Sequence, residues 1–259
     1  MIDVPMKPTV PFDKHTIAAI NQIKVQGVHS ANNITNMNTN YSANANHQNK
    51  ANSQNRINNQ NIVISSNPII PNKPIPPFIH EIQKGQKVSL PITLSMKLKA
   101  CLGWNVLNNN CDVDVSAFML GTSGKVLDDN WFVFYGQTQS PDNSTVFSES
   151  FAEDREIISI DMAKLNKSVT KIVFVLTINE ALEKKLNFSM IKDAYIRIIN
   201  CSNNTELVSF KMTEYYANVT SMMIGELYLY KGNWKFNAVG NGVARDLAGL
   251  CELYGVQVI

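Results

Sequence analysis

After residue 80 the 259-residue sequence contains no histidine, because its four histidines are His15, His29, His47 and His80. This absence excludes Ser-His-Asp and Cys-His catalysis, and imidazole-ligated zinc, from the larger part of the chain. The chemistry that remains there relies on oxygen from carboxylates, amides and backbone carbonyls, which are the ligands of a hard cation such as calcium. The long C-terminal part is therefore predicted to bind rather than to catalyse.

Long hydrophobic runs are also absent, since no stretch approaches the roughly 18–20 apolar residues that a membrane-spanning helix needs. The first five residues offer neither the basic start nor the apolar core of a signal peptide. The cysteines, Cys101, Cys111, Cys201 and Cys251, form no C-x-x-C motif, although four could make two disulfides. We expect a cytoplasmic protein whose cysteines are reduced thiols packed as small apolar groups.

The sequence divides into a low-complexity tail and one folded domain. Residues 31–61 hold 13 asparagines and three glutamines with few large apolar side chains, a composition that predicts disorder. Five prolines in residues 68–77 favour an extended spacer. Neither part carries the dense basic patch that would indicate a nucleic-acid partner. We assign residues 1–79 to an Asn/Pro-rich tail and residues 80–259 to the domain.

From residue 87 onward, apolar and polar residues alternate in short segments separated by turns. Met96, Leu98, Ala100 and Leu102 share one face of a predicted strand. The other predicted strands are 112–120, 131–135, 156–162, 171–179, 194–200, 205–212, 221–230 and 234–239. Helices are expected near 180–186 and, ending at Gly255, over 243–254. Many short strands with brief turns predict an all-β protein, an antiparallel β-sandwich with a short C-terminal helix.

An ordered series of short phrases, covering roughly residues 81–250, resembles the TerD family of bacterial tellurium-resistance and stress-response proteins. The phrases are Lys84-Gly85, Val88-Ser-Leu90, Leu102-Gly-Trp104, Asp112-Val-Asp114-Val-Ser-Ala-Phe118, Gly124-Lys-Val126, Phe132-Val-Phe-Tyr135, Ser140-Pro-Asp142, Lys171-Ile-Val-Phe174, Thr177-Ile178, Asn187-Phe188, Ala194-Tyr-Ile-Arg197, Gly225-Glu-Leu-Tyr228, Trp234-Lys-Phe236 and Ala238-Val-Gly240. The order of the series is more specific than any one phrase, and the resemblance does not extend to the tail.

The resemblance implies a cytosolic, calcium-binding β-sandwich that accompanies tellurite, oxidative or phage stress, with no agreed enzymatic reaction. It also implies protein partners among other stress-response components. The family's calcium ligands come from a D-x-D strand, an acidic segment before F-[IV]-F-Y, polar residues after that motif, and a long acidic loop. The positions that correspond to them here, with the nearby Asp142, are Asp112, Asp114, Asp128, Asp129, Gln137 and Asp142.

Asp112 and Asp114 stand two apart in a predicted strand, so they project from one face with Cα atoms about 6.6 Å apart. Two such carboxylates repel each other unless water or a cation lies between them. With Gln137, the other acids, carbonyls and water, they could complete the six to eight oxygens that calcium takes. Alternatively, these acids only keep a strand end and its loops soluble.

The sequence departs from the family pattern at two places. Trp131 stands where the family has a further acid, and residues 147–154 replace the longer acidic loop, leaving Glu149, Glu153 and Asp154 as substitutes. Calcium affinity is therefore expected to be weak, about 10⁻⁴–10⁻³ M. Three functions stay open: a calcium-tuned stress protein, a protein-interaction module whose calcium site has decayed, and a hydrolase that uses a metal-bound water.

Overall fold

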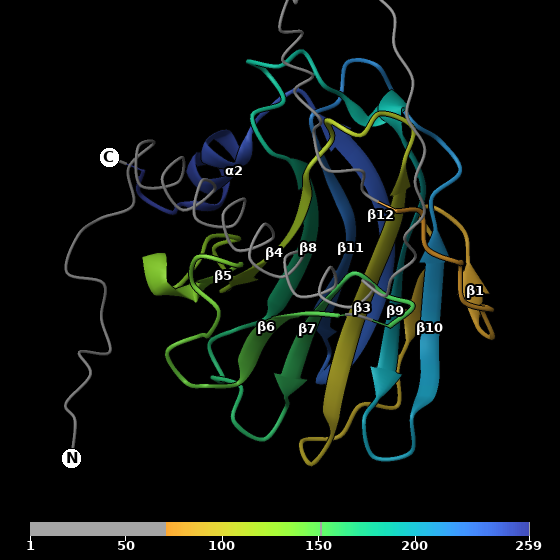
Figure 1. Cartoon of the computed structure of the whole chain (residues 1–259). Helices are drawn as coiled ribbons and strands as arrows, with labels where there is room; N and C mark the ends of the chain where they lie inside the picture. Colours follow the sequence, from red (N-terminus) through yellow and green to blue (C-terminus); the bar gives the residue numbers. More distant parts are fainter. Residues whose placement is uncertain (1–70, 151, 259) are drawn as a thin grey trace, which may run out of the picture.

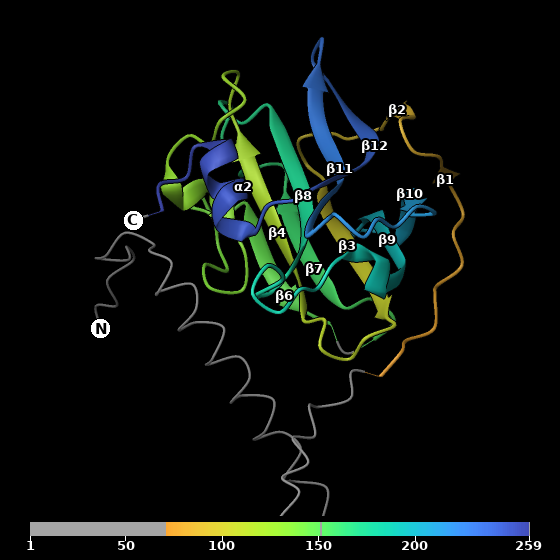
Figure 2. The ribbon, with the colours of Figure 1, turned by 90° about the horizontal axis from the view of Figure 1, so that it is seen from above.

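The computed structural model describes residues 71–150 and 152–258, whose strands form two six-stranded β-sheets that face each other (Figure 1). Figure 2, seen from above, shows the two layers edge-on, with the C-terminal α-helix at one side. The expected all-β sandwich with a short C-terminal helix is confirmed. The prediction of disorder for residues 31–61 concerns residues outside the described ranges.

Sheet A has the strand order β1-β10-β9-β3-β7-β6. Its neighbours pair antiparallel except β1 and β10, which run parallel. The strands of sheet A are β1 (Glu81–Ile82), β3 (Lys97–Val106), β6 (Thr145–Glu149), β7 (Glu156–Asp161), β9 (Ile191–Asn200) and β10 (Thr205–Lys211).

Sheet B has the order β2-β12-β11-β8-β4-β5, and all of its neighbours pair antiparallel. Its strands are β2 (Lys87–Ser89), β4 (Val113–Leu120), β5 (Phe132–Val133), β8 (Lys171–Ile178), β11 (Ser221–Tyr230) and β12 (Asn233–Val243). Strands β4 and β8 are buried along nearly their whole length, since the other sheet covers one face and loops or the helix cover the other.

The alternation of polar and apolar residues determines which face of β3 lies in the core. Lys97 and Lys99 are exposed, whereas Leu98 and Ala100 have no exposed surface and join the core between the sheets. Fully buried phenylalanines from sheet B, including Phe174 of β8, belong to the same continuous core. Interdigitation of two inner faces is the packing expected of a β-sandwich.

Strands β11 and β12 form the hairpin that the residues Lys231-Gly232 predicted. Tyr230 pairs with Asn233, and both turn residues have positive φ, 50° at Lys231 and 79° at Gly232. Positive φ at both central positions defines the turn type whose twist matches two antiparallel strands. The predicted strand 221–230 coincides with β11.

The helix, α2 (Leu247–Tyr254), begins where Asp246 accepts a hydrogen bond from the Gly249 N–H at 2.8 Å, and it ends at Gly255 with a left-handed φ of 84°. The predicted helix began four residues too early, because Val243 is still paired with Ser221 in the sheet. Tyr254 packs on Phe118 of β4 with ring centroids 4.6 Å apart, which fixes the helix over that strand.

Two further predicted elements differ from the structure. In place of the predicted helix 180–186, residues 180–185 form turns, because Glu180 and Lys185 have φ values of 51° and 54°, and the 3₁₀-helix η2 (Phe188–Met190) follows. The predicted strand 131–135 is reduced to the two residues of β5, since a 3₁₀-helix, η1 (Asp129–Trp131), supplies its beginning.

All four cysteines are free thiols, as predicted, and three are buried while Cys201 is exposed. Burial raises the pKa of Cys101 and Cys251 to about 12 and that of Cys111 to about 11. These three thiols pack as apolar groups. Within the described ranges, no helix combines the length and hydrophobicity needed to span a membrane.

Candidate functional site

The acids of the D-x-D motif lie at the start of β4. Asp112 precedes the strand, and its carbonyl accepts a hydrogen bond from the Asn179 N–H at 2.8 Å. Asp114 is only 5 % exposed and pairs with Thr177 of β8. Next to it, the Val115 N–H donates at 2.7 Å to the carboxylate of Glu156, which is also buried. The edge strand β5 pairs only with Ala117 and Phe118, so it does not reach Val115. The Glu156 carboxylate therefore accepts the Val115 N–H in place of a strand neighbour.

The second acidic pair serves the turn before β5. Asp128 caps η1 by accepting hydrogen bonds from the N–H and the side-chain amide of Asn130, at 2.9 and 3.0 Å. Asp129 accepts the Gln257 N–H at 2.9 Å, which ties η1 to the residues after α2. Gln137 donates from its amide nitrogen to the carbonyls of Asn130 and Phe132. These three side chains therefore hold the local backbone.

Asp142 organises the turn before β6. One of its carboxylate oxygens accepts hydrogen bonds from the Ser140 hydroxyl and the Ser144 N–H, at 2.7 and 2.9 Å. The other accepts the Asn166 N–H at 2.8 Å. Burial alone would raise the pKa of Asp142, but these hydrogen bonds to the charged form outweigh burial and lower it.

We expect Asp142→Asn to destabilise the protein near pH 7 and to have a shrinking effect as the pH falls. The pKa of Asp142 is lower in the folded state, so its stabilising contribution is present above the unfolded-state pKa, about 3.9, and is lost as the pH falls through the lower folded value. Urea unfolding of both proteins from pH 7 to pH 2.5 or so measures the difference. Glu183→Gln, at an exposed position, is the control, and an Asp142→Asn effect that is constant across this range would contradict the assignment.

The strand register separates the two acidic pairs. Phe118 of β4 pairs with Phe132, so the residues before Phe132, including Asp129, lie toward the Leu120 end of β4. Leu120 lies six positions after Asp114 along β4, a distance of about 20 Å at 3.4 Å per residue. Asp142 binds Asn166 in the segment that leads into Lys171, the partner of Leu120, so it too belongs to that end.

The predicted calcium ligands are thus distributed over the sandwich rather than gathered. Within residues 71–150 and 152–258, no three His, Cys, Asp or Glu side chains come together in a way that could hold a metal ion. A single calcium ion takes its oxygens from one shell at 2.3–2.6 Å, so the six predicted residues do not fit one ion together. Whether calcium binds this protein at all stays a prediction.

The shortened loop supplies a buried ion pair instead of a metal ligand. Both carboxylate oxygens of Asp154 accept hydrogen bonds from Arg197 of β9, at 2.8 and 2.9 Å, and one also accepts the Tyr195 hydroxyl at 3.0 Å. The two charged side chains are only 12 % and 11 % exposed. Burial works against the charge of Arg197, but the Asp154 carboxylate outweighs it and raises the pKa of Arg197.

Residues 71–80, here called the strap, lie against the same part of sheet A. Asn105 of β3 holds the strap backbone at two points. Its side-chain oxygen accepts the Lys73 N–H at 2.8 Å, and its nitrogen donates to the Lys73 carbonyl at 3.0 Å. A side-chain amide that bonds both backbone groups of one residue imitates a strand neighbour and requires an extended partner.

The Lys73 ammonium group ends in a cage of carbonyl oxygens. It donates to the carbonyls of Ser150, Ala152 and Asp154 at 2.9, 2.8 and 2.7 Å, which uses all three of its donors. Burial and the nearby Arg155 lower the pKa of Lys73, while Asp154 opposes them. The cage selects an ammonium group at this position.

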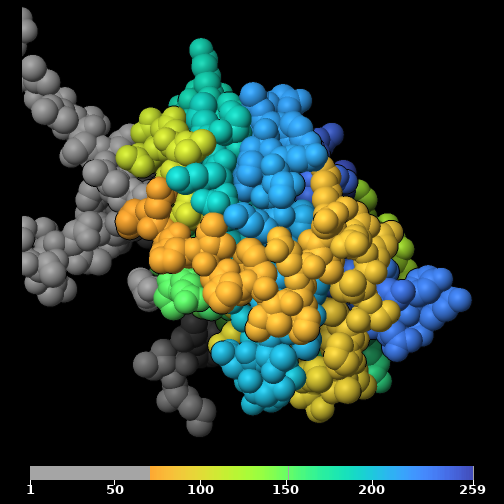
Figure 3. All heavy atoms as spheres, turned by 90° about the vertical axis from the view of Figure 1, so that its right-hand side faces the viewer, coloured from red at the N-terminus to blue at the C-terminus, as the bar shows by residue number. Residues whose placement is uncertain are grey.

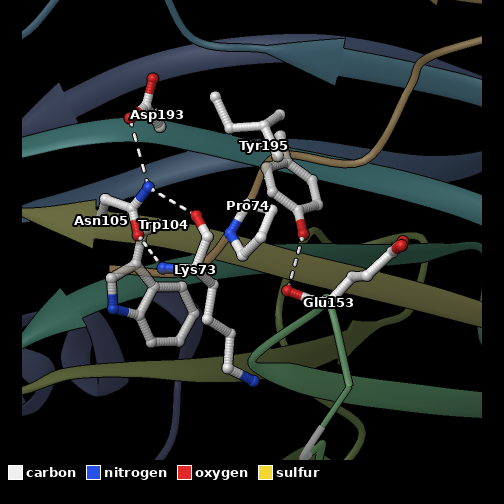
Figure 4. A pocket seen from close by; sticks show the side chains of 8 residues that line it. Lys73, Pro74, Trp104, Asn105, Glu153, Asp193 and Tyr195 are labelled. Carbon is white, nitrogen blue, oxygen red and sulfur yellow. Dashed lines mark hydrogen bonds between the residues drawn. The ribbon is translucent and has the colours of Figure 1, made fainter. Parts of the chain in front are cut away.

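Aromatic side chains complete the surface beneath the strap. Phe78 meets Tyr195 edge to face with ring centroids 5.4 Å apart, and Trp104 lies with the Arg155 guanidinium 5.7 Å from its ring. Figure 4 shows Pro74 beside Tyr195 and the Lys73 chain running past Trp104 toward the loop. The pocket in this view is lined by Lys73, Pro74, Ile75, Trp104, Asn105, Glu153, Asp193 and Tyr195.

Comparison with known proteins places the sandwich in a family. The family model described as the TerD domain matches residues 78–254. The chain belongs to the TerD family. Tellurium resistance protein TerD from Serratia marcescens is 37 % identical over 187 residues, which cover 68 % of this chain and 97 % of that protein. General stress protein 16U from Bacillus subtilis (strain 168) is 34 % identical over 189 residues, with the same two coverages.

A solved structure supports the same fold for the TerD domain. The protein of unknown function SAV2460 superposes with a TM-score of 0.51 at 16 % sequence identity, covering 64 % of this chain and 99 % of that one. At this identity the likeness concerns the fold alone. The resemblance inferred from the sequence is confirmed by the family match, while that match begins at residue 78 and leaves most of the strap outside the TerD domain.

Sequence reasoning missed several residues of this TerD domain that the structure brings together. Glu156 could have been recognised, because it continues the buried face of Ile158 and Ile160 in the alternation of β7. Arg197 carried no local signal, since its partner Asp154 is 43 residues away. Asn105 and Lys73 are likewise far apart in the sequence and come into contact only in the folded protein.

Proposed function

We propose that this TerD-family protein acts without enzymatic turnover in a cytoplasmic stress or tellurite response, by binding partner proteins. The observation that carries the proposal is the family match over residues 78–254, together with relatives named for tellurium resistance and general stress. The local geometry supports a binding role, because Asp128 and Asp142 are engaged in capping and turn hydrogen bonds rather than aimed at one reaction centre.

Among the three functions, the interaction module with a decayed calcium site agrees best with the geometry. The two ends of β4 hold separate acids, and Trp131, where the family has an acid, is a buried core residue. A metal-assisted hydrolase would need its carboxylates around one metal-bound water. The separation of the acids along β4 does not support that arrangement.

The proposal is tested by expressing the full chain in a tellurite-sensitive bacterium and measuring survival under tellurite and peroxide. We expect protection by the wild type and by Asp112→Asn, whose side chain lies at the strand end and has no catalytic part in this proposal. Failure of the wild type to protect against either challenge would contradict the stress role. Protection lost in a folded Asp112→Asn protein would point instead to chemistry or metal binding at that acid.

We expect calcium to change the melting temperatures of the wild type and of Asp112→Asn/Asp114→Asn by the same amount. The calcium concentration is about 1 mM, which would half-fill even a weak protein site. A ligand stabilises the native state in proportion to its binding there, so a decayed site gives no calcium-specific shift. Differential scanning calorimetry with calcium or magnesium measures each protein against its own metal-free value.

A calcium-specific rise that the double variant loses would show that Asp112 and Asp114 bind the ion, and would restore the calcium-tuned alternative. A rise of equal size in both proteins would place the ligands elsewhere. Either result replaces the decayed-site version of the proposal and leaves the stress role to the survival experiment.

A further inference from the structure

The strap, residues 71–80, crosses the surface of sheet A as a separate layer. Figure 3 shows it as an orange band on the face of the molecule, beside the green segment that ends near residue 150. At one end the Arg155 guanidinium donates to the Pro71 carbonyl at 2.8 Å. At the other end, the N–H groups of Ile79 and His80 donate to one oxygen of Glu206 at 2.9 and 2.8 Å. The strap is therefore held along its whole length.

The domain contacts three features of the extended strap: the backbone of Lys73, its ammonium group and the prolines that follow. Asn105 bonds both backbone groups of Lys73, which fixes the direction and the extended conformation of the chain. The carbonyls of Ser150, Ala152 and Asp154 form the cage that takes the Lys73 ammonium group. The residues that follow are proline-rich, Pro74-Ile-Pro-Pro77, and they pass Trp104 and Tyr195 as in the aromatic grooves that receive proline-rich segments.

Beneath the C-terminal end of the strap, two buried polar side chains of β10 are incompletely paired. Glu206 and Ser209 of β10 are 4 % and 0 % exposed. The second carboxylate oxygen of Glu206 and the hydroxyl of Ser209 have no hydrogen-bond partner in the described part of the chain. Water would satisfy both groups if the strap moved away, so their burial reduces the stability of the docked strap. A segment of the hydrophobic core would instead cover groups whose hydrogen bonds are all formed.

The receiving surface and the strap also differ in origin. The TerD domain match begins at residue 78, so Asn105, Trp104, Tyr195 and the cage loop are inside the family domain while Lys73 and Pro74 are outside it. Directly after the strap, β1 joins the edge of sheet A through only two residues, Glu81 and Ile82. The strap thus behaves as a ligand that is covalently attached to its receptor.

We propose that the groove formed by Trp104, Asn105, Tyr195 and the carbonyls of Ser150, Ala152 and Asp154 is a peptide-recognition site for an extended segment carrying Lys-Pro-x-Pro, and that the strap fills it as an exchangeable internal ligand. A partner protein that presents the same sequence chemistry binds when the strap leaves. This site deepens the proposed function, on which it rests for the expectation of a protein partner, because it names the surface and the class of segment bound.

The test uses the full chain and a fluorescein-labelled peptide with the sequence of residues 71–80, followed by fluorescence anisotropy. In Lys73→Met the strap keeps its prolines and its length but loses the ammonium group that enters the cage. We expect this variant to bind the peptide about tenfold or more tightly than the wild type, because the internal competitor occupies the groove for a smaller fraction of the time. Lys167→Met, at an exposed position remote in sequence from the strap, is the matched control and should bind like the wild type.

Two further measurements make the result specific. The same peptide with methionine in place of its lysine should bind Lys73→Met at least about tenfold more weakly, which tests the cage without altering the protein. Asn105→Ala in the Lys73→Met background should abolish saturable binding. Hydrogen exchange at residues 71–80 shows whether the strap is released in Lys73→Met.

A released strap without saturable peptide binding would overturn the proposal, and so would binding that ignores the peptide lysine. Unchanged hydrogen exchange at residues 71–80 in Lys73→Met would overturn the proposal as well, since the cage would then contribute nothing to docking of the strap. These outcomes leave the survival experiment under tellurite and peroxide unaffected, so failure of the peptide site and failure of the stress role are distinguishable.

Discussion

Replacing Gly103 by alanine is expected to destabilise the protein by about 1–3 kcal/mol, the usual cost of overpacking a filled site, and to loosen the strap. An added Cβ would lie only 2.3 Å from the Cζ and hydroxyl oxygen of Tyr195, a separation at which one group must move. Tyr195 cannot easily move, because it is 2 % exposed and its hydroxyl donates to Asp154 at 3.0 Å. Urea unfolding gives the free energy, and hydrogen exchange at residues 71–80 reports on the strap.

The contribution of the ring is isolated by repeating Gly103→Ala in a Tyr195→Ala background. There the methyl group has room, so the substitution should cost much less than in the wild type, and the double-mutant cycle should show a coupling of about 0.5–3 kcal/mol. Equal costs in the two backgrounds would mean that the strand, and not the ring above it, disfavours a side chain at residue 103.

Alternation in the sequence predicted the sheets well because a strand face is a local property. The segment 221–230 was recovered without error, since Met222 and Ile224 are buried and Lys231-Gly232 marks the turn. Edge strands were harder. The strand β2 is three residues long and β1 only two, so neither offers enough residues to show a period, and their pairing depends on β12 and β10 far along the chain.

The acids were harder to interpret than the strands, because a carboxylate near a turn has two common uses. Asp128 and Asp142 were assigned to a cation, yet each lies two residues before a backbone N–H that it accepts, at Asn130 and Ser144. That spacing is the ordinary Asx turn, which the sequence already contained. Whether acids from separate turns converge depends on strand register, and register is not visible until the partners of β4 are known.

The docking of the strap was not predictable from composition. Prolines in residues 68–77 indicated a spacer, which describes the conformation of the segment but not its contacts. The groove that receives it is assembled from β3, β9 and the carbonyls of Ser150, Ala152 and Asp154, which are separated from both strands by dozens of residues. The family resemblance could not help, because the TerD domain match starts at residue 78.

The second large effect concerns the ion pair between Arg197 and Asp154. We expect Arg197→Met to destabilise the protein by about 3–5 kcal/mol, the cost of leaving one charge of a buried pair without its partner. The remaining Asp154 carboxylate would lose both hydrogen bonds from the guanidinium and keep the one from the Tyr195 hydroxyl. For comparison, Lys97→Met breaks a contact of 3.7 Å with Asp161 in which the lysine is 69 % exposed, and it should cost about 0–1 kcal/mol.

The decisive comparison is the double variant Arg197→Met/Asp154→Asn. With both charges removed, no buried charge is left unpaired, so the double variant should be more stable than Arg197→Met alone by chemical denaturation. Its Tyr195 hydroxyl still meets an acceptor in the asparagine side chain, which keeps the ring above Gly103 in place. If instead the two substitutions add without coupling, the pair does not act as a unit, and the rigidity of the sheet A surface under the strap must come from the aromatic packing of Tyr195 and Phe78.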